Sequence, residues 1–222
     1  MSKTLLEKPI LICLYGAPGS GKTFVSRNLS DVLQIAHVSA DKLRGQLFAN
    51  PRFDAQENSI VFHLMNYMTE EYLNAGLSVV YDARLPKTAQ RRKLRDLARK
   101  HKAEYLLVWL QIDGDSAFAR TQQRDHRTAD DRDAQEITQQ LFSEFIAEMQ
   151  NPQAEDYMVI SGKHAFATQK SAIIHRLYQM GLVKSDTVQK TITKPELINL
   201  IPKSNNESEI EPLETYRNIS VF

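Results

Sequence analysis

Residues 16–23 form a glycine-rich loop that strongly limits how the rest of the chain can fold. The loop reads Gly-Ala-Pro-Gly-Ser-Gly-Lys-Thr and follows a continuous apolar run over residues 9–15. Such a run is typical of a central strand that is covered on both faces. The residues after the loop, with Val25 and Leu29 on one side, predict a helix. Strand, loop and helix therefore follow one another as in a phosphate-binding loop.

Each residue type in this loop has a physical role in binding phosphate. Glycines let backbone N–H groups turn towards a phosphate without Cβ clashes, and the N-terminus of the next helix adds partial positive charge. Lys22 can reach the β- and γ-phosphates of a nucleoside triphosphate, and the Thr23 hydroxyl can ligate Mg²⁺. The chain is therefore expected to bind ATP with Mg²⁺. The predicted nucleotide contacts are Gly16, Ala17, Pro18, Gly19, Ser20, Gly21, Lys22 and Thr23.

Composition excludes several other classes of protein. Apolar residues make up 42% and charged residues 25%, which is ordinary for a globular protein. A net charge of +1 gives no overall attraction to nucleic acid or to a membrane surface. No apolar run approaches the about 18 residues of a membrane span, and the first residues lack the apolar core of a signal peptide. The single cysteine, Cys13, excludes a disulfide framework. We expect a cytoplasmic protein without membrane contact.

Short apolar runs alternate with amphipathic segments along the chain, which is typical of a parallel α/β sheet. The predicted strands are 9–15, 35–38, 77–81, 104–112 and 157–160. The predicted helices are 22–33, 41–48, 57–73, 87–101, 116–124, 134–149 and 167–180. The predicted fold is a three-layer α/β/α P-loop NTPase with a parallel sheet of about five strands.

The amino-acid composition changes after residue 184. Residues 185–222 contain three prolines, a Ser-Asn-Asn stretch and more acids than bases. We therefore predict an ATP-binding domain over 1–184 and a C-terminal extension over 185–222, partly disordered or docked. Its apolar segment 197–201 makes the extension a candidate site for a protein partner.

Asp82 follows the third predicted strand, Val79-Val-Tyr. An acid at a strand end lies beside the phosphate loop in an open α/β sheet. It could hold Mg²⁺ through water or orient a substrate. A helix cap or a buried partner for an arginine would explain the same residue. The chain has no Asn-Lys-x-Asp motif of a GTPase, and a single acid here differs from the acidic pair usual in motor ATPases.

Asp41 and Arg44 follow the second predicted strand and lie three residues apart on one helical face. A carboxylate there can accept a proton from an attacking hydroxyl, and the arginine can hold an anionic part of the acceptor. A plain helix start, with Ser39 or Asp41 as the N-cap, is the alternative.

Arg120 and Arg124 lie four residues apart, before a polar stretch over 125–133 that contains four acids. This pattern favours a mobile lid that closes over ATP and neutralises charge on the transferring phosphoryl group. Arg127 and Arg132 are weaker candidates for the same role. A salt-bridged surface helix is the alternative.

Four motifs in order resemble the P-loop kinase family that includes polynucleotide kinase and the zeta-toxin-like and chloramphenicol phosphotransferases. They are Gly16-x4-Gly-Lys-Thr23, Asp41-x2-Arg44, Val-Val-Tyr-Asp82 followed by Arg91-Arg92, and Arg120-x3-Arg124. The resemblance covers residues 9–180.

The resemblance implies a role for each matching residue. Asp41 would be the general base, Arg44 an acceptor contact, and Asp82 would orient acceptor or metal. Lys22, Thr23 and Arg124 would act on ATP. The chain reads Asp82-Ala-Arg84-Leu where polynucleotide kinases have Asp-Thr-Asn-Leu, so a cation, Arg84, enters the expected acceptor site.

Residues 84–102 contain nine basic residues and one acid, Asp96. On a helical wheel Arg91, Arg95, Arg99 and Lys102 share a face, with Arg92 at its edge. They could form a phosphate track for a nucleic acid, or a solvated outer helix face.

The predicted function is ATP- and Mg²⁺-dependent phosphoryl transfer to a hydroxyl acceptor. A polynucleotide 5′-hydroxyl is one candidate acceptor, and a sugar, nucleoside or antibiotic hydroxyl is the other. A nucleotide-binding module that regulates a partner is the alternative outside enzymes. No catalytic role is predicted for the six histidines.

Overall fold

The computed structural model describes residues 3–128 and 131–184. Five parallel strands form one sheet in the order β2-β3-β1-β4-β5. They are β1 (Ile10–Tyr15), β2 (Ile35–Ser39), β3 (Ser78–Asp82), β4 (Glu104–Gln111) and β5 (Tyr157–Ser161). The predicted number and direction of the strands are confirmed. The predicted extension 185–222 lies outside the described residues.

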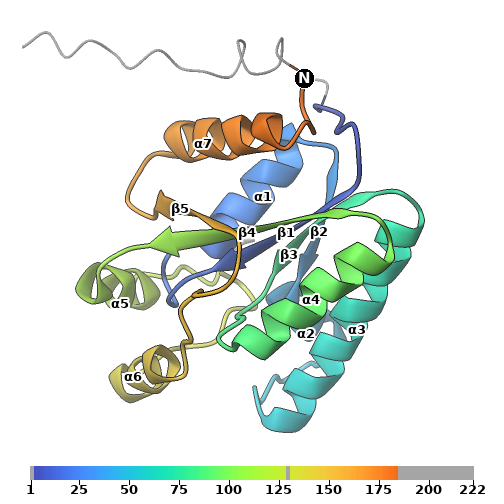
Figure 1. Ribbon diagram of the computed structural model, residues 1–222. Coiled ribbons are helices and arrows are strands. Elements are labelled where there is room, and N and C mark those ends of the chain that lie inside the picture. Colours follow the sequence, from blue (N-terminus) through green and yellow to red (C-terminus); the bar gives the residue numbers. More distant parts are fainter. Residues whose placement is uncertain (1–2, 129–130, 185–222) are drawn as a thin grey trace, which may run out of the picture.

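Helices cover both faces of this sheet. They are α1 (Lys22–Val32), α2 (Ala40–Leu47), α3 (Ala55–Asn74), α4 (Thr88–Lys100), α5 (Gly114–Gln122), α6 (Gln139–Ala147) and α7 (Phe166–Gln179). Figure 1 shows α1 and α7 on one face and α3 and α4 on the other. The predicted three-layer α/β/α architecture is confirmed.

The sixth helix starts later than the sequence predicts. Residue 134 was the expected start, but α6 begins at Gln139, because the Thr138 side chain caps it by accepting a hydrogen bond from the Leu141 N–H. Residues 131–137, just before Thr138, therefore form no helix.

The alternating side chains of β1 divide the core into two layers. Ile10, Ile12 and Leu14 pack against α1 and α7. Leu11, Cys13 and Tyr15 point to the other face, where α3 and α4 cover them. Every residue of β1 is buried. The continuous apolar run therefore reflects a strand covered on both faces.

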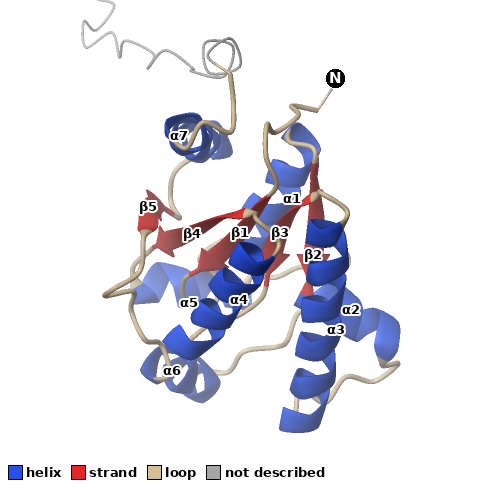
Figure 2. Ribbon diagram, turned by 45° about the vertical axis from the view of Figure 1, so that its right-hand side comes forward, coloured by secondary structure: helices blue, strands red, loops and turns tan. Residues whose placement is uncertain are grey.

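The functional residues are positioned by the carboxyl ends of β1, β2 and β3. Ser39 at the end of β2 pairs with Asp82 at the end of β3, and β1 lies beside β3. In a parallel sheet these ends share one edge, and a crevice opens where the strand order changes direction, here at β1. Figure 2 shows α5 and α6 at the far end of the sheet from the N-terminus.

Candidate functional site

The phosphate loop joins β1 to α1. Gly19 and Gly21 have φ angles of 77° and 98°, in the left-handed region that favours glycine. A Cβ at Gly19 would also overlap the carbonyl of Ala117 in α5. The Lys22 ammonium donates to the carbonyls of Gly16 and Ala17, at 2.9 Å each. The predicted strand, loop and helix are thus all in place, with Lys22 folded over the loop.

A cleft of about 820 Å³ opens beside this loop. Its walls come from α2, α3, the start of α4, the segment after α5, and α6. Predicted site residues that line it are Pro18, Gly19, Gly21, Lys22, Thr23, Asp41, Arg44, Asp82, Arg84, Arg120 and Arg124. Sequence positions as far apart as 18 and 124 therefore meet in one cavity.

Asp82 lies between Thr23 and a histidine. The Thr23 hydroxyl donates to Asp82 Oδ1 at 3.3 Å, and His37 Nε2 lies 3.0 Å from Asp82 Oδ2. The His37 side chain is 9% exposed. Hydroxyl and carboxylate oxygens are ligands that suit Mg²⁺, so Thr23 and Asp82 fit the predicted metal site. His37 was not predicted to take part. The only signal in the sequence was the place of this histidine among apolar residues of the second predicted strand.

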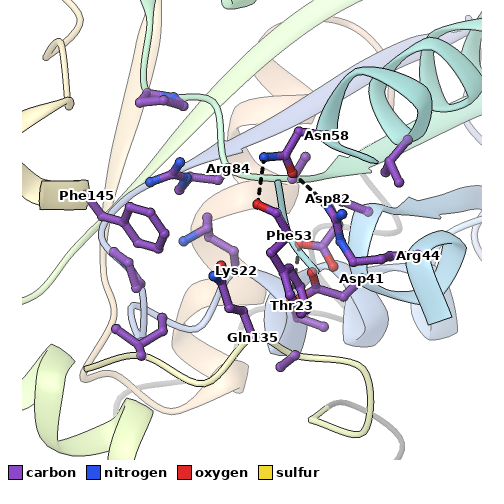
Figure 3. Close-up of a pocket in the computed structure, with 18 of the residues that line it drawn as sticks. Lys22, Thr23, Asp41, Arg44, Phe53, Asn58, Asp82, Arg84, Gln135 and Phe145 are labelled. Carbon is purple, nitrogen blue, oxygen red and sulfur yellow. Dashed lines mark hydrogen bonds between the residues drawn. The ribbon is translucent and has the colours of Figure 1, made fainter. Parts of the chain in front are cut away.

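Asp41 stands in the first turn of α2, facing the phosphate loop (Figure 3). Burial, and then the neighbouring negative charge of Asp82, raise the pKa of Asp41 to about 6. Burial and Arg124 lower the pKa of Lys22 to about 8, while Asp82 and Asp41 oppose that shift. At neutral pH this leaves a carboxylate and an ammonium facing one cleft. The N-cap of α2 is Ser39, and the Ser39 side chain makes no capping hydrogen bond.

Arg44 lines the cleft, but its amino groups have partners inside the protein. One donates to Glu57 at 3.1 Å and the other to Asn58 at 2.6 Å. The guanidinium also lies over the Phe53 ring, 4.6 Å from its centroid. The Glu57 carboxylate accepts from the backbone N–H of Phe53 as well. Arg44 therefore differs from the expected free contact for an acceptor anion.

The two predicted lid arginines occupy different places. Arg124 donates to the carbonyl of Gln135 at 2.8 Å and acts electrostatically on both Lys22 and Asp41. Arg120 donates instead to the carbonyl of Gly162, in the loop after β5. Arg127 pairs with Asp125 and is 91% exposed. Of the two, Arg124 is therefore the one whose charge acts on the predicted reacting groups.

Neither alternative for the basic residues of α4, a phosphate track or a solvated outer face, holds at Arg91. Its side chain is fully buried and donates to Glu155, with Nη2 2.7 Å from Oε1. It also donates to the carbonyls of Leu85 and Gln150, and lies over the Tyr15 ring. The helical wheel could not show this, because the covering segment lies about 60 residues away.

Several of the remaining cations of α4 are paired on the surface. Arg92 and Arg99 lie 4.0 and 3.5 Å from Asp96, and Lys100 lies 2.5 Å from Glu70 of α3. These pairs favour a solvated outer face, the alternative to a nucleic-acid track.

A family model described as "AAA domain" matches residues 11–152. The chain belongs to the AAA domain family. Its matched region runs from β1 past α6 and includes the phosphate loop, Asp41, Asp82 and Arg124. No curated protein matches the chain.

Several solved structures share the fold of this AAA domain. A gluconokinase from Sinorhizobium meliloti 1021 is 17% identical, with a TM-score of 0.57 over 78% of this chain and 93% of that one. Kti12 from Chaetomium thermophilum, in complex with ADP-AlF3, is 14% identical, with a TM-score of 0.57 over 76% and 97%.

A chain of the Pnkp1/Rnl/Hen1 RNA repair complex is 17% identical, with a TM-score of 0.55 over 64% of this chain and 44% of that one. At such identities the likeness concerns the fold. The AAA domain therefore has a P-loop kinase-like fold.

No group of three or more His, Cys, Asp or Glu side chains in residues 3–128 and 131–184 is placed to hold a metal ion. No helix in these residues is long and apolar enough to cross a membrane.

Proposed function

We propose that this AAA domain transfers the γ-phosphate of ATP to a hydroxyl group of an acceptor. The observation that carries the proposal is Asp41, a carboxylate with a raised pKa that shares one cleft with Lys22 and Thr23. A domain that only binds ATP has no need of a base beside its phosphate loop. General bases work best with a pKa near the working pH.

The nucleotide half of the reaction depends on the phosphate loop. Loop N–H groups and the start of α1 attract the phosphates, and Lys22 exchanges the loop carbonyls for phosphate oxygens. Thr23 and Asp82 would hold Mg²⁺, which when bound neutralises charge on the β- and γ-phosphates. His37 holds Asp82 from the side away from Thr23.

The acceptor half of the reaction depends on Asp41. The acceptor hydroxyl gives its proton to the Asp41 carboxylate as its oxygen bonds to the γ-phosphorus. The bond between that phosphorus and the β–γ bridging oxygen breaks, and ADP leaves with the electron pair. Arg124 lies near Lys22 and would balance negative charge on the phosphoryl oxygens.

The acceptor is proposed to be recognised inside the cleft. Arg91 is interior, and Arg92, Arg99 and Lys100 have acidic neighbours, so α4 offers few free charges to a long strand. A small molecule, or the terminal nucleotide of a strand, could be bound inside the cleft without contacts along α4. The named likenesses include both a gluconokinase and a chain of an RNA repair complex.

The test is phosphate transfer from labelled ATP to a panel of acceptors. The panel holds D-gluconate, D-glucose, nucleosides, and RNA and DNA with 5′-hydroxyl ends. We expect a labelled product with at least one acceptor, lost in Asp41→Asn. ATP binding without transfer to any member would favour the regulatory module instead.

A further inference from the structure

Arg44 and Arg84 both line the cleft, yet their surroundings differ. The Arg44 side chain is 5% exposed and forms a buried ion pair with Glu57, whose side chain is 3% exposed. Glu57 also accepts backbone N–H groups of Arg52 and Phe53. The charge of Arg44 is therefore balanced within the protein. An incoming anion would have to break a buried pair, which is costly.

Among the residues that the structure describes, one acid is paired with Arg84, and that acid is exposed. Its Nη2 lies 3.3 Å from Glu148 Oε2, and the two side chains are 35% and 49% exposed. Its Nη1 is buried without a hydrogen-bond partner among the described residues. Burial lowers the pKa of Arg84. One amino group of this guanidinium is thus shielded from water and the other is only loosely paired, so an anion with better geometry would stabilise it.

An aromatic ring holds Arg84 in place. Its guanidinium carbon lies 3.5 Å from the centroid of the Phe145 ring. Phe145 and Glu148 lie one turn apart, at the end of α6 and just after it. The stacked ring fixes one face of the guanidinium and leaves its edge for hydrogen bonds. Such an edge matches a carboxylate or a phosphate, which accept two parallel N–H groups.

Arg84 also lies across the reacting centre from the proposed base. Figure 3 shows Arg84 and Phe145 on one side of Lys22, with Thr23, Asp41 and Asp82 on the other. The charge of Arg84 reaches Lys22. An acceptor whose charged group is bound at Arg84 would therefore have room to extend past Lys22, with its hydroxyl towards Asp41.

We propose that Arg84 selects the acceptor by binding an anionic group of it, a carboxylate or a phosphate, in exchange for Glu148. This inference rests on the proposed function, because it assigns the acceptor of that reaction. The acceptor class is then a hydroxyl compound with a second, negatively charged group. A sugar acid and a nucleotide with a 3′-phosphate share this chemistry.

The experiment measures binding by calorimetry in the presence of Mg²⁺ and a non-hydrolysable ATP analogue. Two matched pairs of probes are used: D-gluconate with D-glucose, and adenosine 3′-phosphate with adenosine. We expect the anionic member of one pair to bind more tightly than its neutral partner, and that pair identifies the source of the charge. Arg84→Gln should weaken that probe about 10- to 100-fold and leave the neutral partner unchanged.

Glu148→Gln should act in the opposite direction. Removing the competing carboxylate should tighten the same probe about 2- to 5-fold. Glu144→Gln is the matched control, because Glu144 lies one turn earlier on α6 and outside the cleft lining. A folded Arg84→Gln protein that binds the anionic probe as well as the wild type overturns the inference. So does a wild type that prefers neither anionic probe.

Transfer from labelled ATP, measured with the same proteins and probes in separate samples without the analogue, separates this inference from the proposed function. Selective binding without transfer contradicts the proposed function and leaves the role of Arg84 in binding intact. A kcat that falls equally for charged and neutral acceptors in Arg84→Gln, with KM unchanged, would place Arg84 on the γ-phosphate instead. That result would overturn the inference while the proposed function stands.

Discussion

Four charged side chains from three segments meet around Lys22. Asp41, Asp82, Arg84 and Arg124 each act on its ammonium, two in each direction. Burial is the largest cause of its lowered pKa. The two acids and the two arginines therefore have opposite effects on the pKa of Lys22 before nucleotide binds. The negative charge of bound phosphates would favour the charged form of Lys22.

Asp41→Asn should separate chemistry from nucleotide binding. The amide keeps the size of the side chain but cannot take a proton, so transfer should fall about 10²- to 10⁴-fold while ATP affinity hardly changes. Because the pKa of Asp41 is raised to about 6, the wild-type rate should rise with pH up to about 6 and then level off. Acceptor assays from pH 5 to 8 measure both effects, with exposed Asp115→Asn as the control. Normal turnover in Asp41→Asn would place the base elsewhere.

His37→Leu should weaken the metal site. Side chains that orient a metal-binding carboxylate commonly contribute about 10- to 100-fold to metal affinity, and His37 holds Asp82 at 3.0 Å. Titration of Mn²⁺ into the ATP-bound protein measures the change. Affinity for ATP without metal should stay the same. His175→Leu, at an exposed site on α7, is the control; equal Mn²⁺ affinity in both variants would contradict a role for His37.

At the scale of elements, Arg91 ties α4 to the segment between α6 and β5. Its guanidinium joins Leu85, Gln150 and Glu155, which come from two distant parts of the chain. The same segments carry Arg84 and Glu148. We call these contacts of Arg91 the clamp. It holds in place the wall of the cleft on which the acceptor site is proposed.

Arg91→Leu should lower the free energy of unfolding by about 3–5 kcal/mol, because it leaves the Glu155 carboxylate buried without a partner. Urea unfolding measures this change. Arg92→Leu on the exposed face should change stability by less than about 1 kcal/mol. The double variant Arg91→Leu, Glu155→Leu should recover part of the loss. Equal stability of the two single variants would show that the clamp contributes nothing.

The segment after α5 contacts α2 at Gly45. A Cβ there would overlap the Asp133 carboxylate. Gly45→Ala should therefore displace this segment while raising helix stability by about 1 kcal/mol, since alanine favours a helix over glycine. Limited trypsin digestion should cut faster after Arg132 in the variant than in the wild type. Cutting no faster than in the wild type would mean that the contact does not hold the segment.

At the scale of the whole molecule, the sequence predicts the features that depend on local apolar patterns and on the parallel order of the strands. Apolar runs fixed the strands within a few residues, and strand ends brought Lys22, Asp41 and Asp82 to one edge. Arg91 could not be placed, because Glu155 lies 64 residues away. The ion pair of Arg44 with Glu57 also depends on how α2 meets α3, which periodicity does not encode.

Nucleotide binding should stabilise the whole domain, because the loop, β1 and α1 are built around one buried core. A ligand that binds the folded state alone adds about 2.7 kcal/mol at a hundred times its Kd. For a chain of 222 residues, about 1 kcal/mol raises the melting temperature by about 2–4 °C, so saturating Mg²⁺ and ATP should raise it by about 5–10 °C.

Differential scanning calorimetry tests this shift. Lys22→Ala should keep the unliganded melting temperature near that of the wild type and lose most of the shift, because the ammonium is a main contact for phosphate. Lys100→Ala, on the far side of α4 from the loop and paired with Glu70, is the control and should keep the full shift. A wild-type protein that shows no shift with millimolar Mg²⁺ and ATP would contradict nucleotide binding, and with it both proposals for the cleft.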